Sequence, residues 1–145
     1  MKIACVSDIH GRLIRSDIPE CDVLVVAGDI CPVHNHSVDF QHNWLLKEFN
    51  PWLDYVRDNV TDNIVVIAGN HDWVFEKEPD IGKELHCNYL QESDCIIDGV
   101  KFYGFADTPY FCNWAFNRQD FELVKIYSNI PEDTNVLLSH GPPCG

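Results

Sequence analysis

Four short apolar runs constrain the fold of this 145-residue chain more than any other feature of its sequence. They lie at 2–7, 22–27, 63–68 and 135–139, and a polar residue follows each one within two positions. The sequence of a strand that is covered on both faces is nearly continuously apolar, because neither face is exposed to water. The sequence therefore predicts four buried strands in a largely parallel or mixed sheet.

Helical patterns lie between these runs. Between the second and third runs, apolar residues recur every three or four positions, at Leu45, Phe49, Leu53 and Val56. This spacing predicts a helix with one apolar face packed on a sheet. The dipeptide Asn50-Pro51 interrupts the pattern, because proline lacks the N–H that a helix interior needs. It either kinks one long helix or begins a second helix with Asn50 as its cap.

The second half of the chain predicts two further helices and a pair of strands. Helices are expected over 73–85, with Asp72 as a candidate N-cap, and over 119–128. The segments 94–98 and 100–106, which Gly99 separates, alternate well enough to form a hairpin. Strands alternating with helices indicate the α/β class. A length of 145 residues with 46% apolar and 23% charged residues suits one domain over 1–145.

Charge and hydropathy exclude several kinds of partner. Ten Lys and Arg against 23 Asp and Glu give a net charge of −13, which argues against non-specific binding of nucleic acid. The sequence has no apolar stretch of the roughly 20 residues that a membrane span needs, and its first residues do not resemble a signal peptide. We therefore expect a cytoplasmic protein without a membrane partner. Seven cysteines without a Cys-x-x-Cys pair predict reduced, mostly buried thiols.

Residues that commonly bind metal ions follow each of the four apolar runs. They are Asp8 and His10, then Asp29, then Asn70 and His71, and finally His140. Each motif alone is an ordinary turn, but side chains at the carboxyl ends of several strands converge on one edge of an α/β sheet. Carboxylate and amide oxygens together with imidazole nitrogens suit borderline divalent ions such as Mn, Fe, Zn or Ni. The four motifs together predict a metal site.

These motifs, in this order, resemble the signature of the calcineurin-like metallophosphoesterase superfamily, which reads D-x-H, G-D, G-N-H-[DE] and a later His. The segments 99–104, 114–117 and 137–143 resemble a small subgroup of metallophosphoesterase-domain-containing proteins that includes cyclic-nucleotide phosphodiesterases. The resemblance runs from Lys2 to Gly145. It implies a sandwich of two mixed β-sheets flanked by helices.

The resemblance also implies a reaction and a role for each residue of the cluster. It implies a metal-dependent phosphoesterase, a hydrolase that acts on phosphodiesters such as cyclic nucleotides. A hydroxide that bridges two divalent ions would attack phosphorus in line. The implied roles are Asp8 and His10 on a first ion, Asp29 bridging both ions, Asn70 and His140 on a second ion, and His71 as the catalytic histidine. Asp72 is either a helix cap or a residue that orients His71.

One block of the family signature has no counterpart in this sequence. The final G-H-x-H motif, which supplies two histidine ligands, is absent, so the family fold is expected to lack its C-terminal strands. Weaker binding of two ions, or binding of one ion only, would follow. The alternative function is a catalytically weak or inactive module that binds phosphate or metal or serves assembly. An uncovered sheet edge also predicts a homo-oligomer.

Two groups of residues near the predicted site have two interpretations each. His34 and His36 are exposed loop histidines, which we favour, or replacement ligands. Tyr110, Phe111 and Trp114 form a hydrophobic plug at one end of the sandwich, which we favour, or a platform on which a nucleobase stacks.

Overall fold

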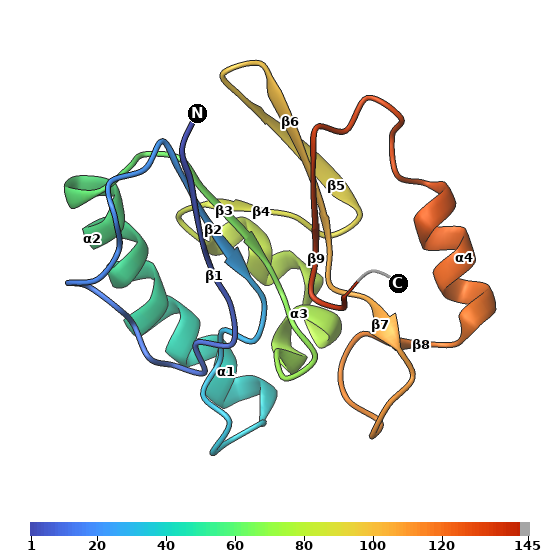
Figure 1. Cartoon of the computed structure of the whole chain (residues 1–145). Helices are drawn as coiled ribbons and strands as arrows, with labels where there is room; N and C mark the ends of the chain where they lie inside the picture. The colour runs from blue at the N-terminus through green and yellow to red at the C-terminus, as the bar shows by residue number, and fades with distance from the viewer. Residues whose placement is uncertain (143–145) are drawn as a thin grey trace.

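A computed structural model of the chain describes residues 1–142, which form two larger β-sheets with helices on their outer faces and one two-stranded sheet (Figure 1). The first sheet has four parallel strands in the order β1 (Ile3–Val6), β2 (Val23–Ala27), β3 (Ile64–Ile67) and β4 (Asn88–Tyr89). The second has the order β5 (Ser93–Ile97), β6 (Val100–Phe105) and β9 (Val136–Ser139). Strands β5 and β6 are antiparallel, whereas β6 and β9 are parallel. A short parallel pair joins β7 (Thr108–Pro109) to β8 (Asn117–Arg118).

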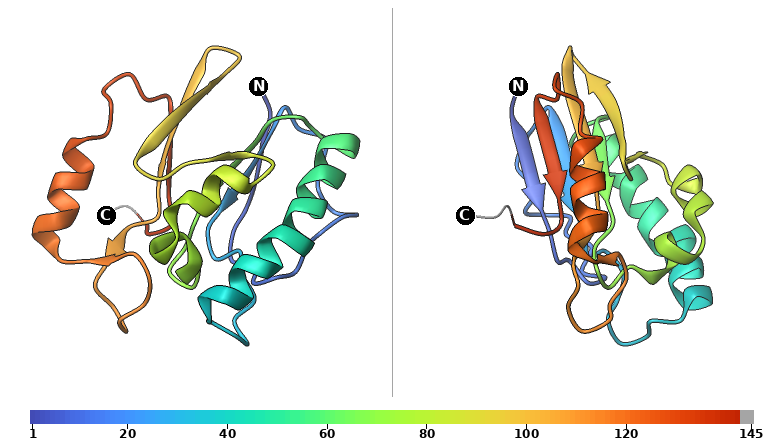
Figure 2. Two further views of the ribbon diagram at one scale, coloured as in Figure 1. Left: turned by 180° about the vertical axis from the view of Figure 1, so that it is seen from behind. Right: turned by 90° about the vertical axis from the view of Figure 1, so that its right-hand side faces the viewer.

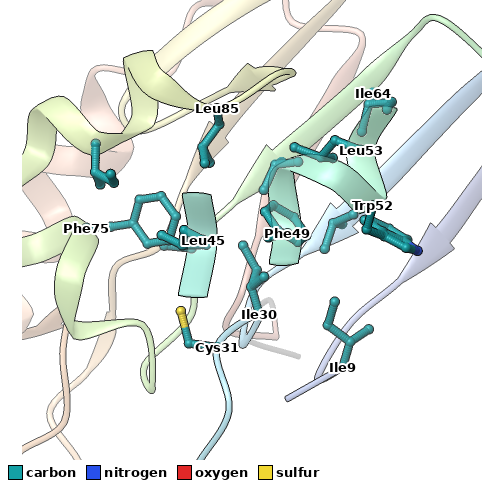
Figure 3. Packing of buried hydrophobic residues seen from close by; sticks show 14 of the residues in the cluster. Ile9, Ile30, Cys31, Leu45, Phe49, Trp52, Leu53, Ile64, Phe75 and Leu85 are labelled. Carbon is teal, nitrogen blue, oxygen red and sulfur yellow. The ribbon is translucent and has the colours of Figure 1, made fainter. Parts of the chain in front are cut away.

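The two sheets pack face to face, and alternate residues of the central strands divide between two cores. One core lies between the sheets and contains Val23, Val25, Val65, Ile67, Ile97, Phe102 and Leu138. The intervening residues of β2 and β3 point toward the helices instead, because successive side chains of a strand face opposite ways. Figure 3 shows this second core, where Phe49, Trp52 and Leu53 pack near Ile64 of the sheet.

The helices form two separate layers (Figure 2). On the first sheet lie α1 (Val38–Trp44), the π-helical segment η1 (Leu45–Phe49), α2 (Asn50–Asn59) and α3 (Trp73–Lys77). Helix α4 (Asp120–Ser128) packs on the second sheet, where Leu123 and Ile126 contact Tyr103 and Phe105. The α/β sandwich predicted from the sequence is confirmed, and its larger sheet is parallel throughout the four described strands.

The Asn50-Pro51 interruption lies within one continuous helical run. Asn50 has helical backbone angles, with φ −58° and ψ −46°, and its N–H donates to the carbonyl of Leu45 five residues back. This π-type hydrogen bond lets the helix continue past Pro51, which has no N–H to donate. The Asn50 side chain caps no second helix, because its amide donates to Glu84 O at 2.9 Å and its oxygen accepts from His86 N–H at 3.1 Å.

Two sequence predictions about the helices have different outcomes. The helix expected over 73–85 is wrong beyond Lys77, where Glu78 leaves helical geometry and a 3₁₀ segment η2 (Pro79–Glu84) follows. Pro79 explains the break, because it disfavours helical angles in the preceding residue. The helix expected over 119–128 is confirmed as α4, where Glu122 accepts the Gln119 N–H at 2.9 Å.

The remaining expectations concern thiols and membranes. Six cysteines among residues 1–142 carry free thiols, and Cys144 lies outside the described residues. The prediction that most are buried is wrong, because only two of these six, Cys21 and Cys31, are buried, whereas Cys87 and Cys95 are partly exposed and Cys5 and Cys112 are exposed. Within the part of the chain that the structure describes, every helix is too short or too polar to cross a bilayer.

Candidate metal centre

The loops after β1 and β2 continue the parallel pairing of these strands beyond their ends. The N–H of Asp8 donates to Gly28 O at 3.0 Å, and the N–H of His10 donates to Asp29 O at 2.9 Å. A third such bond joins Gly11 N–H to Ile30 O at 2.8 Å. The two loops are therefore held in fixed register, which places their side chains at one edge of the sheet.

Asp8, His10 and Asp29 form a first set of ligand atoms. One atom from each lies within 4.8 Å of the others, and His10 Nε2 is 3.6 Å from Asp29 Oδ2. His10 Nδ1 is buried and has no hydrogen-bond partner among residues 1–142. Two carboxylates beside the Nε2 atom of an imidazole fit a divalent cation, which would offset their negative charge.

Asp29, Asn70 and His140 form a second set beside the first. His140 Nδ1 lies 3.0 Å from Ala27 O, a carbonyl that can only accept, so Nδ1 carries the proton. A ring with its single proton on Nδ1 has a lone pair on Nε2. His140 Nε2 lies 2.8 Å from Asn70 Oδ1 and 3.5 Å from Asp29 Oδ1. A histidine held through Nδ1 that turns Nε2 toward two oxygens is the usual arrangement around a metal ion.

Asp29 connects the two sets, because each of its oxygens faces a different histidine. Oδ2 faces His10, whereas Oδ1 faces His140 and also accepts the His71 N–H at 2.9 Å. The residue is 3% exposed, so its carboxylate has little access to water. This position suits a ligand shared by two cations.

Unusual backbone angles shape the site. Asp8, His10 and Asp29 have φ values of 54°, 44° and 53°, a left-handed region that residues other than glycine seldom adopt. Such conformations persist where the surrounding structure enforces them, commonly at functional sites. Here the backbone bonds between the loops after β1 and β2 enforce them.

His71 lies at the rim of the two ligand sets, with rings on several sides. Its ring centroid is 5.4 Å from that of His10, 5.2 Å from that of His36 and 4.8 Å from that of Trp114. Burial lowers the pKa of His71, the Asp29 carboxylate raises it, and the neighbouring histidines lower it, with a net decrease.

Asp72 lies at the N-cap position of α3, as the sequence predicts, but its side chain forms no capping hydrogen bond there. Its fully buried carboxylate accepts N–H groups of Ile30 at 3.0 Å, Cys31 at 2.8 Å and Gly69 at 2.8 Å. It caps no helix through its side chain and joins the loop after β2 to the loop after β3. Burial raises the pKa of Asp72 despite these three donors.

Gln41 is a buried residue of this region that the sequence reasoning missed. Its amide donates to His71 O at 2.8 Å, and its oxygen accepts the Val74 N–H at 3.0 Å. A sequence signal was available, because Gln41 lies four residues before Leu45 on the apolar stripe. A polar residue on such a stripe indicates a buried hydrogen bond.

The aromatic segment after β7 lies beside the site and does not fill the core. Tyr110 and Phe111 are 57% and 64% exposed, so the favoured interpretation as a hydrophobic plug is wrong for them. Trp114 is half-buried against His71. A cleft of about 190 Å³ is lined by residues of this segment and of the second ligand set, among them Phe111, Trp114, Asn70 and His140.

An α/β sandwich whose strand ends bring together carboxylate, amide and imidazole side chains that could hold divalent ions suits a metal-dependent phosphoesterase. Residues 1–144 match the family model described as calcineurin-like phosphoesterase, and the chain belongs to this family. The chain is 31% identical, over 99% of its length, to metallophosphoesterase domain-containing protein 1 of Homo sapiens, of which it covers 49%. It is 27% identical over its whole length to UPF0046 protein K07C11.7 of Caenorhabditis elegans, of which it covers 52%. The chain thus spans about half the length of these curated relatives.

Proposed function

We propose that this chain hydrolyses phosphodiesters at a dinuclear metal centre. The observation that carries the proposal is the position of Asp29, whose two oxygens face His10 and His140 in separate ligand sets. Asp8 and His10 are proposed for one ion and Asn70 and His140 for the other. The family supports a metal-dependent phosphoesterase in general.

The proposed chemistry divides between the cations and the residues of the chain. Two divalent ions of the Mn, Fe, Zn or Ni type, when bound, activate water and offset charge on the phosphoryl oxygens. His71 is proposed to contact the phosphate and to donate a proton to the leaving oxygen. Asp29 holds the loop of His71 in place through the His71 N–H.

The cleft beside the second ligand set supports a small organic phosphodiester, such as a cyclic nucleotide, as the substrate. Phe111 and Trp114 lie along it with ring centroids 5.4 Å apart, and a nucleobase can stack on such rings. The net charge of −13 repels long polyanions, whereas a single phosphodiester carries one charge that the ions offset. We therefore propose a small-molecule substrate.

The proposal is tested by hydrolysis of bis(p-nitrophenyl) phosphate with added Mn²⁺ or Ni²⁺. Replacing a residue that only orients a metal ligand lowers metal affinity or activity about 10- to 100-fold. Asp29 is proposed as a ligand itself, so Asp29→Asn is expected to lower kcat/KM by more than about 100-fold. Asp62→Asn, which removes the same charge from an exposed loop, is the matched control and should keep the activity. Equal metal-dependent rates for wild type and Asp29→Asn would overturn the proposal.

The alternative, a module that binds metal or phosphate without catalysis, predicts a different set of results. Elemental analysis would find bound metal in the wild-type protein, and Asp29→Asn would reduce it, while neither protein would hydrolyse the phosphodiester. Metal content and hydrolysis, measured for the wild type and for Asp29→Asn, therefore distinguish the two functions.

We also propose a cytoplasmic homo-oligomer. Phe121 and Val124 on α4 are 76% and 67% exposed, and Leu137 on β9 is 49% exposed. Strand β9 pairs only with β6 among the described strands, which leaves one edge open to a second copy. Light scattering at micromolar concentration is expected to give at least a dimer, and a monodisperse monomer would contradict this.

A further inference from the structure

We infer that Asn117 is a positioning residue that holds Phe111 and Trp114 in place to stack on the planar base of a small phosphodiester. The inference rests on the proposed function and extends it from the reaction to the choice of substrate. The two rings belong to the aromatic loop, which we define as residues 110–116 between β7 and β8. Asn117 directly follows this loop, and its side-chain amide is hydrogen-bonded to the loop backbone.

The oxygen of the Asn117 amide fixes the tip of the aromatic loop. Oδ1 accepts the Phe111 N–H at 3.0 Å and the Trp114 N–H at 3.1 Å. Backbone N–H groups only donate, so these two partners also determine which way the amide is turned. The bonds lie on either side of Cys112 and Asn113, whose φ values of 55° and 53° are left-handed. Such angles persist where the surrounding structure enforces them, and here the amide of Asn117 does so.

The nitrogen of the same amide connects the tip of the aromatic loop to its base. Nδ2 of Asn117 donates to Thr108 Oγ1 at 3.1 Å, on the strand β7 that pairs with β8. The Thr108 N–H donates to Phe116 O at 2.9 Å and closes the loop. The Ala115 N–H donates to Asn70 O at 3.0 Å, which attaches the loop to the segment of a proposed metal ligand. The aromatic loop is therefore held in a fixed position beside the candidate metal centre.

The rings that Asn117 positions lie at the cleft and not in the core. Phe111 is largely exposed and Trp114 is half-buried, and their planes are 76° apart. Both rings and Asn117 line the cleft of about 190 Å³ beside His140. Aromatic rings that are held outside the core gain little from packing, so their fixed position suits contact with a ligand.

A loop that is already ordered spares its ligand the cost of ordering it. Immobilising side chains and loops on binding lowers affinity, and a preformed site avoids this loss. Stacking of one base on aromatic side chains is worth about 5- to 150-fold in affinity. Loss of the Asn117 amide should therefore weaken binding of a substrate that carries a base more than binding of one that does not.

The first experiment needs no activity and uses the metal-free full chain. NMR measures hydrogen–deuterium exchange of the Phe111 and Trp114 amides. We expect both to exchange about 5-fold faster or more in Asn117→Ala, which removes their acceptor. Asn117→Asp, whose carboxylate still accepts, should keep the exchange of the wild type. Asn129→Ala, which removes an exposed amide at the end of α4, is the matched control and should also keep it.

The amides of the central strand β2 report opening of the whole fold and serve as an internal reference. They should exchange alike in the wild type and in Asn117→Ala. Unchanged exchange of Phe111 and Trp114 in this variant would overturn the inference, whether or not the chain is an enzyme. Equal acceleration in β2 would also overturn it, because Asn117 would then stabilise the fold as a whole.

The second experiment compares two chromogenic diesters with added Mn²⁺, the p-nitrophenyl ester of thymidine monophosphate and methyl p-nitrophenyl phosphate. They share the leaving group and differ in the nucleoside, so the ratio of their kcat/KM values measures what the nucleoside contributes. Asn117→Ala and Phe111→Ala are each expected to lower this ratio about 5-fold or more, mainly by raising KM for the thymidine ester. Asn129→Ala should keep the ratio of the wild type.

The results separate this inference from the proposed function. If the wild type hydrolyses neither ester, the proposed hydrolysis fails, and calorimetric titration with thymidine monophosphate and methyl phosphate measures the same preference as a ratio of dissociation constants. A ratio that Asn117→Ala leaves unchanged, in either measurement, would show that Asn117 does not determine the choice of ligand.

Discussion

Gly28 shows how tightly single residues are fitted at the candidate metal centre. Its φ is +93°, and a Cβ added there would lie 2.5 Å from His140 Nδ1 and 2.8 Å from Ala68 O. Both distances are shorter than contacts that real Cβ atoms make. The missing side chain of Gly28 is therefore what lets His140 bond to Ala27 and turn Nε2 toward the ligand cluster.

Replacing Gly28 by alanine should damage both stability and the site, and Gly99 offers a control with the same backbone strain. Gly99 has φ +79°, and a Cβ there would meet nothing within 4 Å. Gly99→Ala is expected to cost about 1 kcal/mol from backbone conformation alone. Gly28→Ala should cost about 1–3 kcal/mol more, because it overpacks the site, and should weaken binding of Mn²⁺. Urea unfolding and calorimetric titration measure the two effects, and equal costs at both glycines would contradict this account.

Arg118 fastens the segment between β7 and α4, which carries Trp114, to the rest of the fold. Its guanidinium lies 2.9 Å from Glu76 Oε1 on α3 and 2.8 Å from Asp107 Oδ1 in the loop after β6. Burial raises the pKa of Asp107 even beside Arg118, since its side chain is only 1% exposed. Burial also opposes ionisation of Glu76, but the hydrogen bonds from Arg118 and the Phe116 N–H outweigh it and lower its pKa.

The direction of the Glu76 shift predicts how stability depends on pH. Because folding lowers the pKa of Glu76, its ionised form stabilises the folded state above its ordinary value of 4.5, and this contribution is lost as pH falls through the folded pKa. Glu76→Gln should lower the free energy of unfolding by about 1 kcal/mol at pH 7. The difference from wild type should shrink below pH 4.5. Urea unfolding at several pH values measures it, and Glu132→Gln, which removes an exposed carboxylate, should show no such trend.

Electrostatics across the entire protein favour cation binding at the proposed centre. The net charge is −13, and Asp8 and Asp29 bring two carboxylates within one ligand set. Repulsion between close like charges destabilises the folded state. A bound divalent ion offsets this repulsion and binds the folded state in preference to the unfolded chain.

Mn²⁺ should therefore raise the melting temperature. At a free concentration 100 times the dissociation constant, binding adds about 2.7 kcal/mol, which corresponds to roughly 5–10 °C for a domain of this size. The increase should disappear in Asp29→Asn and persist in Asp62→Asn, which separates the site from general screening of surface charge. A calorimetric scan with and without Mn²⁺ decides this, and equal increases in both variants would argue against a specific site.

The sequence alone predicted the elements whose pattern is local. The apolar runs at 22–27 and 63–68 became β2 and β3, and the stripe from Leu45 to Val56 became a helix facing the sheet. Local patterns failed where a proline changed the outcome. Pro79 ended the helix expected to reach residue 85. At Asn50-Pro51 the sequence left a kinked helix and a second helix open, and the π-helical segment before Pro51 shows one continuous helical run.

The sequence by itself determined that carboxylates, amides and imidazoles follow the strands, because strand periodicity and residue identity are written along the chain. Only the tertiary structure decided which atoms face each other. It showed that Asp29 directs its oxygens to two histidines, that Asp72 joins two loops and that His36 contacts His71 across 35 residues. Such contacts depend on loop register and side-chain orientation, which arise from packing between distant segments and leave no periodic signal in the sequence.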